Sequence, residues 1–74
     1  MQLNLIPQRK SLLVNGERTE TEAHTLAELI ATRDLDGDAV ATALNGEFVA
    51  RGARAATLLS DGDKVEIVAP RQGG

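Results

Sequence analysis

The two final residues, Gly73 and Gly74, are the part of the sequence whose residue types most directly suggest chemistry. Glycine lacks Cβ, so a diglycine segment adopts almost any backbone conformation and can enter a narrow channel in another protein. A carboxylate at Gly74 is ionised at neutral pH and is a poor electrophile until it is activated. Conversion to an acyl-adenylate by ATP would let a sulfur nucleophile attack the Gly74 carbonyl. The product would be a thiocarboxylate that carries sulfur or an acyl bond that tags another protein, and the chain would be a substrate in either case.

The rest of the sequence argues against catalysis by the chain itself. Its 74 residues allow one domain without a deep cleft. It has no cysteines, which excludes disulfides, thiolate metal sites and a cysteine nucleophile. The single histidine, His24, has no nucleophilic serine near it in the sequence and is expected to be solvated just before a helix. We therefore predict no catalytic residues and no tightly bound cofactor.

Composition also limits the partners. The net charge of −3 and a single aromatic residue, Phe48, make nucleic acid an unfavourable partner. No apolar run approaches the roughly 20 residues that span a bilayer. The opening segment 1–6 is too short for a secretory signal, and Arg9 and Lys10 follow it rather than precede it. These features predict a cytoplasmic protein that does not contact membranes and is a monomer when free.

The acidic segment 34–38 could suggest a metal site. Its Asp34-Leu35-Asp36-Gly37-Asp38 sequence resembles the start of a calcium loop, but the glutamate that completes the ligand set at the twelfth loop position is missing. We predict no metal here.

Two Asn-Gly dipeptides predict two β-hairpins. Each suits a type I′ turn, in which both central residues need positive φ. The first hairpin pairs residues 11–14 with 17–22, and the second pairs 39–44 with 47–50.

One main helix is predicted between the hairpins. Thr25 and Glu28 have the spacing of a capping box, in which each side chain accepts a hydrogen bond from the backbone near the other. Leu26, Leu29 and Ile30 then form one apolar stripe. The helix is too short to be stable alone, so this stripe must pack on a sheet.

The last third of the chain predicts a crossing segment, a strand and a tail. Residues 51–59 have no clear period and are expected to form a loop with a helical turn, with Leu58 and Leu59 tucked beneath the sheet. The 61–63 turn leads into a final alternating strand, 64–68. Pro70 then ends the pairing.

The order of elements predicts an α+β fold with a mixed sheet of about four to five strands and one main helix on one face. The predicted organisation is residues 1–10 as a leader or an extra strand, 11–69 as the domain, and 70–74 as a flexible diglycine tail.

Several short motifs, in this order and spacing, resemble the ThiS family of thiamine-pathway sulfur carriers over residues 11–74. They are Val14-Asn15-Gly16-Glu17, Ala43-Leu44-Asn45-Gly46-Glu47 with Val49 and Arg51, the segment from Asp61 to Val68, and Gly73-Gly74.

The resemblance implies a ubiquitin-like β-grasp fold, with the first and last strands as parallel neighbours at the centre of the sheet. It implies that an E1-like adenylyltransferase, using ATP and Mg²⁺, adenylates Gly74, which is then converted to a thiocarboxylate with sulfur from a persulfide enzyme. The sulfur goes to thiazole synthase, and Gly73 gives the slim approach to the enzyme channel.

The sequence departs from this family at two positions. The family often has proline where Ala50 stands and an aromatic residue where Arg54 stands. These departures predict that the crossing segment packs more loosely or meets its partners differently.

Three other interpretations remain open. The small subunit of molybdopterin synthase shares the fold and the diglycine, but its last strand typically runs into a Phe-Phe-Pro-Pro segment, whereas residues 66–70 here are aliphatic with one proline. A protein-tagging modifier and a β-grasp binding module without tail chemistry are the other two. Lysine-linked adducts would identify the modifier, and indifference to loss of Gly74 would identify the binding module.

Overall fold

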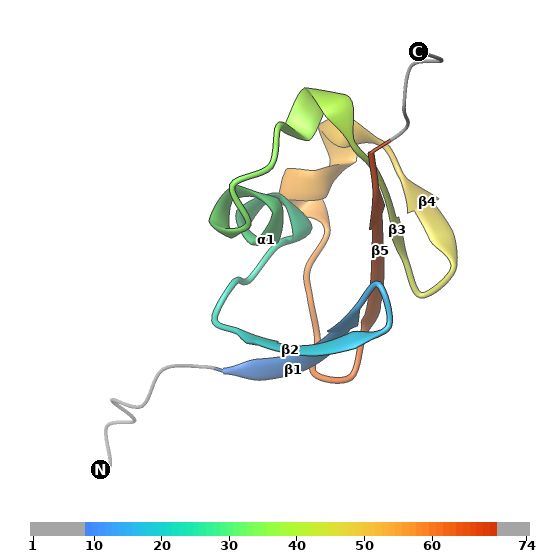
Figure 1. Cartoon of the computed structure of the whole chain (residues 1–74). Helices are drawn as coiled ribbons and strands as arrows, with labels where there is room; N and C mark the ends of the chain where they lie inside the picture. Colours follow the sequence, from blue (N-terminus) through green and yellow to red (C-terminus); the bar gives the residue numbers. More distant parts are fainter. Residues whose placement is uncertain (1–8, 70–74) are drawn as a thin grey trace, which may run out of the picture.

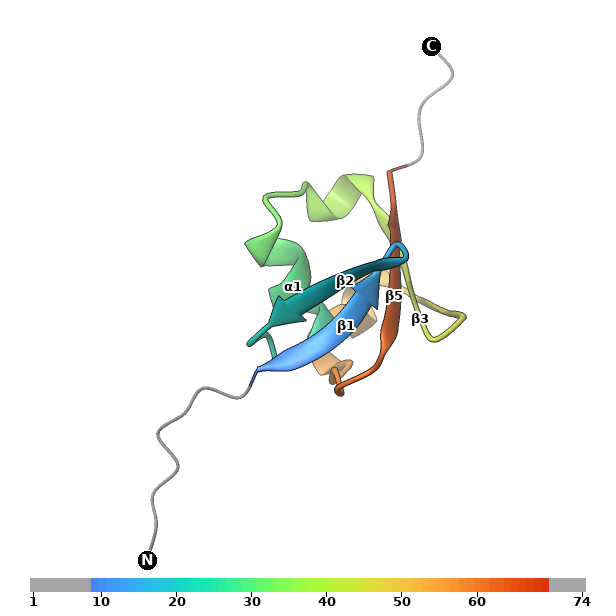
Figure 2. The same ribbon diagram turned by 60° about the horizontal axis from the view of Figure 1, so that its bottom comes forward.

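The computed structural model describes residues 9–69, which form a five-stranded mixed sheet with a helical layer on one face (Figures 1 and 2). In chain order the elements are β1 (Lys10–Val14), β2 (Glu17–Thr21), α1 (Leu26–Thr32), the 3₁₀ turn η1 (Gly37–Ala39), β3 (Ala41–Leu44), β4 (Glu47–Val49), the 3₁₀ segment η2 (Arg51–Ala56) and β5 (Lys64–Val68).

The sheet has the strand order β2-β1-β5-β3-β4. β1 and β5 are parallel, with Val14 opposite Val65, and the other neighbouring pairs are antiparallel. The first and last strands are therefore neighbours and β5 lies at the centre, which confirms the predicted β-grasp arrangement. β1 begins at Lys10, one residue before the expected start of the domain.

Both Asn-Gly turns have the predicted conformation. Asn15 and Gly16 have φ of 54° and 82°, and Asn45 and Gly46 have φ of 53° and 88°. A type I′ turn needs positive φ at both central positions, and asparagine and glycine are the residues that adopt it at least cost. The two hairpins therefore follow from local sequence.

Helix α1 begins with the predicted capping interaction. The Thr25 hydroxyl oxygen accepts a hydrogen bond from the Glu28 backbone N–H at 3.1 Å. The Glu28 carboxylate accepts from the backbone N–H of His24 at 2.7 Å, one residue earlier than in a standard capping box. Both bonds satisfy backbone donors that have no partner within the helix.

The hydrophobic core lies between α1 and the inner face of the sheet. The helix contributes its predicted apolar stripe, and the central strands contribute alternate residues because side chains of a strand point to opposite faces. The buried apolar residues are Leu12, Val14, Ala23, Leu26, Leu29, Ile30, Leu59, Val65 and Ile67.

The crossing segment corrects two expectations. Leu59 is buried as predicted, but Leu58 is 71% exposed. Leu58 forms an isolated β-bridge with Thr25, so the backbone is extended there and neighbouring side chains point in opposite directions. Arg54 is only 5% exposed and each of its three guanidinium nitrogens donates a hydrogen bond, so this part of the segment is not loosely packed. The second hairpin also begins later than the predicted residue 39, because Ala39 belongs to η1 and β3 begins at Ala41.

Candidate functional site

The predicted reactive residue, Gly74, and its neighbour, Gly73, lie outside the described residues, as does the whole 70–74 tail. The part of the site that the structure describes is the end of β5, which leads toward them. Ala69 is the last described residue and follows directly on β5. Because β1 and β5 are parallel, the start of β1 and the end of β5 lie at opposite ends of this pair of strands (Figure 1).

Strand β5 is held from both sides along most of its length. On one side, the backbone N–H of Leu13 donates to the carbonyl of Asp63 at 2.9 Å, and that of Asn15 donates to the carbonyl of Val65 at 2.8 Å. On the other side, the antiparallel ladder with β3 continues to the last residue of β5, where Val68 lies opposite Ala41. The path of the chain is thus fixed up to the point where the tail begins.

The asparagine of each Asn-Gly turn also binds β5 through its side chain. The Asn15 carboxamide oxygen accepts from the Ile67 N–H at 2.8 Å, and its nitrogen donates to the Ile67 carbonyl at 3.0 Å. At the start of β5, the Asn45 oxygen accepts from the Lys64 N–H at 2.9 Å, and its nitrogen donates to an Asp63 carboxylate oxygen at 3.0 Å. The two turns therefore fix the two ends of the same central strand.

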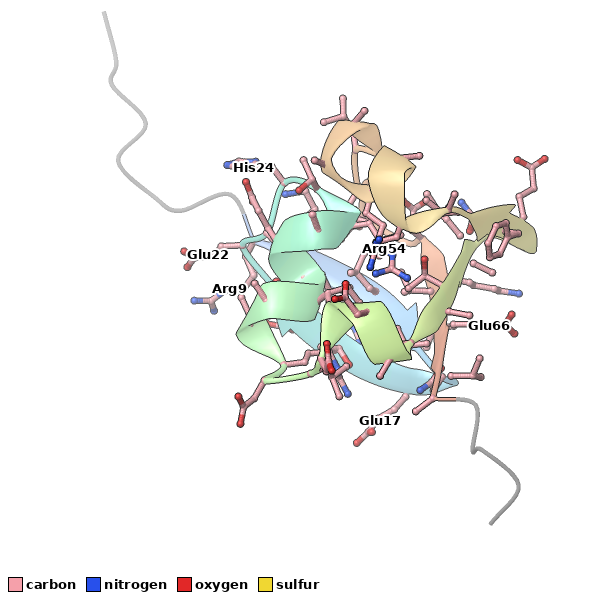
Figure 3. The ribbon with its side chains drawn as sticks, turned by 90° about the horizontal axis from the view of Figure 1, so that it is seen from above. Arg9, Glu17, Glu22, His24, Arg54 and Glu66 are labelled. Carbon is pink, nitrogen blue, oxygen red and sulfur yellow. The ribbon has the colours of Figure 1, made fainter. Side chains whose placement is uncertain are left out.

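The open face of the sheet, opposite α1, carries an apolar patch beside the end of β5. Phe48 is 73% exposed and Val68 is 56% exposed. Together with Ala41 and Ala43 they border a shallow hollow that also includes Glu66. In Figure 3 the Glu66 side chain points away from the body of the protein. We call these residues, Ala41, Ala43, Phe48, Glu66 and Val68, the open-face patch.

His24 is exposed next to the start of α1, as predicted. Figure 3 shows it on the opposite side of the molecule from Glu66. Its backbone N–H is used in the helix cap. Within residues 9–69, no group of three or more histidine, aspartate or glutamate side chains is arranged to hold a metal ion. The same part of the chain has no helix that is long and apolar enough to span a membrane.

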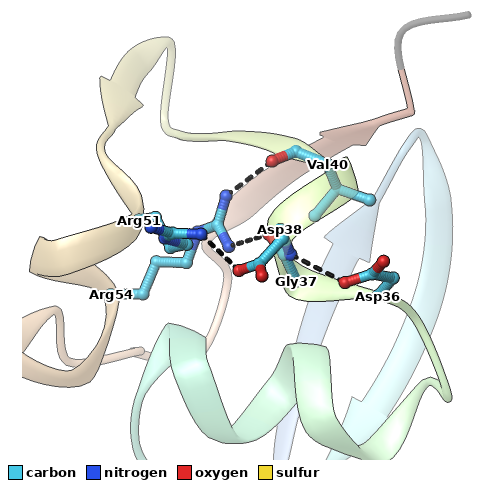
Figure 4. A network of polar contacts seen from close by, with 6 residues as sticks. All are labelled: Asp36, Gly37, Asp38, Val40, Arg51 and Arg54. Atoms are coloured by element: carbon cyan, nitrogen blue, oxygen red, sulfur yellow. Dashed lines mark hydrogen bonds and ion pairs between the residues drawn. The ribbon is translucent and has the colours of Figure 1, made fainter.

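The acidic segment has structural contacts around η1 (Figure 4). The Asp36 carboxylate accepts from the Asp38 N–H at 3.0 Å and caps the turn, and Asp38 forms an ion pair with Arg51. The buried guanidinium of Arg54 lies beside this pair and donates to the carbonyls of Gly37 at 2.9 Å and Val40 at 2.8 Å. These contacts tie η2 to the loop that precedes β3.

Sequence reasoning missed two features of this site. The first is the bonding of the Asn15 side chain to Ile67, because the Asn-Gly signal is explained by turn conformation alone. The second is the open-face patch. Strand alternation could have found it, since Val68 follows Val65 and Ile67 out of phase and Phe48 precedes the inward-facing Val49.

Comparisons with known proteins agree with one another. The model of the ThiS family matches residues 5–74. The crystal structure of a thiamine biosynthesis protein (ThiS) from Geobacter metallireducens is 35% identical, with a TM-score of 0.72 over 86% of this chain and 99% of that chain. An NMR structure of a thiamine biosynthesis protein from the same organism is 32% identical, with a TM-score of 0.71 over 86% and 87% of the two chains. Among curated proteins, none matches the chain.

Proposed function

The chain belongs to the ThiS family, and from this membership we propose that it is the sulfur carrier that supplies thiazole formation in thiamine biosynthesis. The observation that carries the proposal is the extent of the family match, which runs through residue 74 and so includes both glycines. The two similar structures, both of thiamine biosynthesis proteins, support the same pathway.

The reactive atom in this proposal is the carbonyl carbon of Gly74. A carboxylate oxygen attacks the α-phosphorus of ATP and releases pyrophosphate, which gives an acyl-adenylate. A sulfur nucleophile then attacks the carbonyl and displaces AMP. If the nucleophile is a persulfide, a thiol must reduce the resulting acyl disulfide to release the thiocarboxylate. Gly73 leaves the approach to the reacting carbonyl free of side-chain bulk.

The enzymes in this proposal are the partners, and the chain is their co-substrate. An E1-like adenylyltransferase would bind ATP and Mg²⁺, a persulfide enzyme would supply the sulfur, and thiazole synthase would receive it. The carrier would act as a cytoplasmic monomer with no tightly bound cofactor. In the described residues, His24 is exposed far from the end of β5, and the acidic side chains around η1 are engaged in a cap and an ion pair. These contacts support the assignment of the chemistry to the partners.

We further propose that the activating enzyme docks on the open-face patch. Phe48 and Val68 are largely exposed, and Val68 is the last residue of β5, two residues before the 70–74 segment that must enter the enzyme. Exposed aromatic and aliphatic side chains at one place on a small protein are typical of binding surfaces. A partner seated on this face would be next to the start of the tail.

Intact-mass measurement tests the proposed function. The protein is incubated with ATP, Mg²⁺, a ThiS-activating enzyme and a sulfur source, and the expected product is heavier by one exchange of oxygen for sulfur. Tandem mass spectrometry should place the change on Gly74, and a variant that lacks Gly74 should remain unmodified. Absence of any adenylate or thiocarboxylate on the wild-type chain, with an enzyme that charges its own carrier, would refute the proposal.

A further inference from the structure

On the edge that faces β1, strand β5 extends beyond the last residue of β1 that pairs with it. β1 pairs with β5 through Leu13 opposite Lys64 and Val14 opposite Val65, and the chain then turns away at Asn15 and Gly16. The next backbone groups on this edge of β5 belong to Ile67. Without another partner, the Ile67 N–H and C=O would have no strand opposite them.

The side chain of Asn15 fills this place. Its carboxamide offers one acceptor and one donor, and these bond to the Ile67 N–H at 2.8 Å and to the Ile67 carbonyl at 3.0 Å. In a parallel ladder, the N–H and C=O of one residue bond to two different residues of the neighbouring strand, so this single carboxamide takes the place of two backbone partners. Asn15, Ile67 and Ala69 also border one shallow hollow at the end of β5. The hydrogen bonds of the Asn15 carboxamide thus hold the β1-facing edge of β5 at Ile67, two residues before the last described residue, Ala69.

We propose that Asn15 is a positioning residue for Gly74: its carboxamide extends the β1 ladder to Ile67 and thereby sets the direction in which β5 delivers residues 70–74 to the activating enzyme. The inference rests on the proposed function. A segment held in a productive orientation reacts faster because fewer unproductive arrangements of the bound complex compete.

The chain contains a matched control for this inference. Asn45 has the same turn conformation, with φ of 53° against 54° for Asn15, and its side chain also bonds to β5. It bonds to Lys64 at the start of the strand rather than to Ile67 near the end. Glycine accepts positive φ at both sites, so Asn15→Gly and Asn45→Gly each remove one carboxamide with the turn retained.

Amide hydrogen exchange is the first measurement. Asn15→Gly should lower the protection of the Ile67 N–H by about tenfold through loss of one hydrogen-bond acceptor, whereas Asn45→Gly should lower that of Lys64 instead. Unchanged protection of Ile67 in Asn15→Gly would overturn the inference. This measurement needs no partner enzyme and does not depend on the proposed function.

Steady-state pyrophosphate exchange is the second measurement, made on full-length variants at a temperature where circular dichroism shows both folded. Asn15→Gly should lower kcat/KM by about 3- to 30-fold, with the loss in kcat because the docking face is intact, and Asn45→Gly by less than about twofold. Equal rates for the two variants would overturn the role of Asn15 while charging of the wild type still upholds the proposed function. No charging of the wild type would refute the proposed function itself.

If Asn15→Gly does not fold, Asn15→Asp answers the same question. Aspartate keeps the acceptor for the Ile67 N–H but loses the donor and places a carboxylate oxygen near the Ile67 carbonyl. Its kcat should be reduced relative to wild type with KM unchanged. A wild-type kcat in this variant would contradict the inference.

Discussion

The Nε atom of Arg54 donates a hydrogen bond to Thr42 Oγ1 at 3.1 Å, although both side chains are buried, with 5% and 2% of their surface exposed. The Thr42 hydroxyl in turn donates to the Val49 carbonyl at 2.9 Å. With the two bonds to Gly37 and Val40, the guanidinium is surrounded by oxygen acceptors that carry no full charge. A buried cation is tolerated when its polar atoms have hydrogen-bond partners, and here each of the three guanidinium nitrogens donates one bond. These bonds connect η2 with β3 and with the η1 segment.

Replacement of this cation should destabilise the fold. Arg54→Met keeps much of the aliphatic stem but leaves the acceptors at Gly37 and Val40 without their donor, which should lower the free energy of unfolding by about 1–3 kcal/mol. The control is Arg51→Met, which breaks an exposed ion pair with Asp38 and should cost less than about 1 kcal/mol. Urea unfolding followed by circular dichroism measures both. Similar losses in the two variants would show that the Arg54 contacts are not specific.

Truncation of Leu29 tests which face of α1 packs on the sheet. Leu29 is 1% exposed in the core between α1 and the sheet, so Leu29→Ala should lower the free energy of unfolding by about 2–5 kcal/mol. Leu58→Ala is the control, because Leu58 is 71% exposed and its truncation should change stability by less than about 0.5 kcal/mol. The measurement is the urea concentration at the midpoint of unfolding for each variant, compared at an unchanged m-value. A loss below about 0.5 kcal/mol for Leu29→Ala would mean that the core is packed differently.

A methyl group at the penultimate residue should hinder activation. Gly73→Ala adds a Cβ where the enzyme channel is expected to be narrow, so pyrophosphate exchange should slow while the unfolding transition stays at the wild-type midpoint. Gly52→Ala is a suitable control, since an added Cβ there meets no atom within 4 Å and the residue does not have positive φ. Exchange at the wild-type rate in Gly73→Ala would count against a tight channel.

A substitution in the open-face patch should weaken binding to the activating enzyme without lowering the stability of the fold. Phe48→Ala removes an aromatic ring that is 73% exposed, so it should change stability little but raise KM for the activating enzyme by about tenfold, as for a binding hot spot. Leu58→Ala serves again as the control because it removes a similarly exposed side chain elsewhere on the surface. Steady-state kinetics with each variant as the varied substrate give the answer. If KM rises equally in both, the patch is not the docking surface.

The fold could be predicted largely because local signals agree with tertiary packing. Asn-Gly dipeptides define both hairpins, the Thr25 cap defines the start of α1, and Leu26, Leu29 and Ile30 define its buried face. The parallel pairing of β1 with β5 joins residues far apart in the sequence, so composition and periodicity could not identify it. Family resemblance supplied it, and the register confirms it.

The site was less predictable for a physical reason. A side chain such as Asn15 has a local role in its turn and a long-range role with Ile67, and only the local one leaves a pattern in sequence. Arg54 is similar, because arginine is usually exposed and its burial here depends on the Gly37 and Val40 carbonyls and the Thr42 hydroxyl, which lie 12–17 residues away in the sequence. The placement of Leu58 was wrong because the crossing segment gave no period from which to decide which of two adjacent leucines points inward.

The central place of β5 has a mechanical consequence. A partner that binds the residues beyond Ala69 and pulls on them would pull on β5. The force would be resisted by the hydrogen bonds to both neighbouring strands, β1 and β3. A tail that followed an outer strand such as β4 would be held by one ladder only, because β4 pairs only with β3. A pull on the chain beyond Ala69 would therefore have to break two ladders at once before it could unfold the sheet.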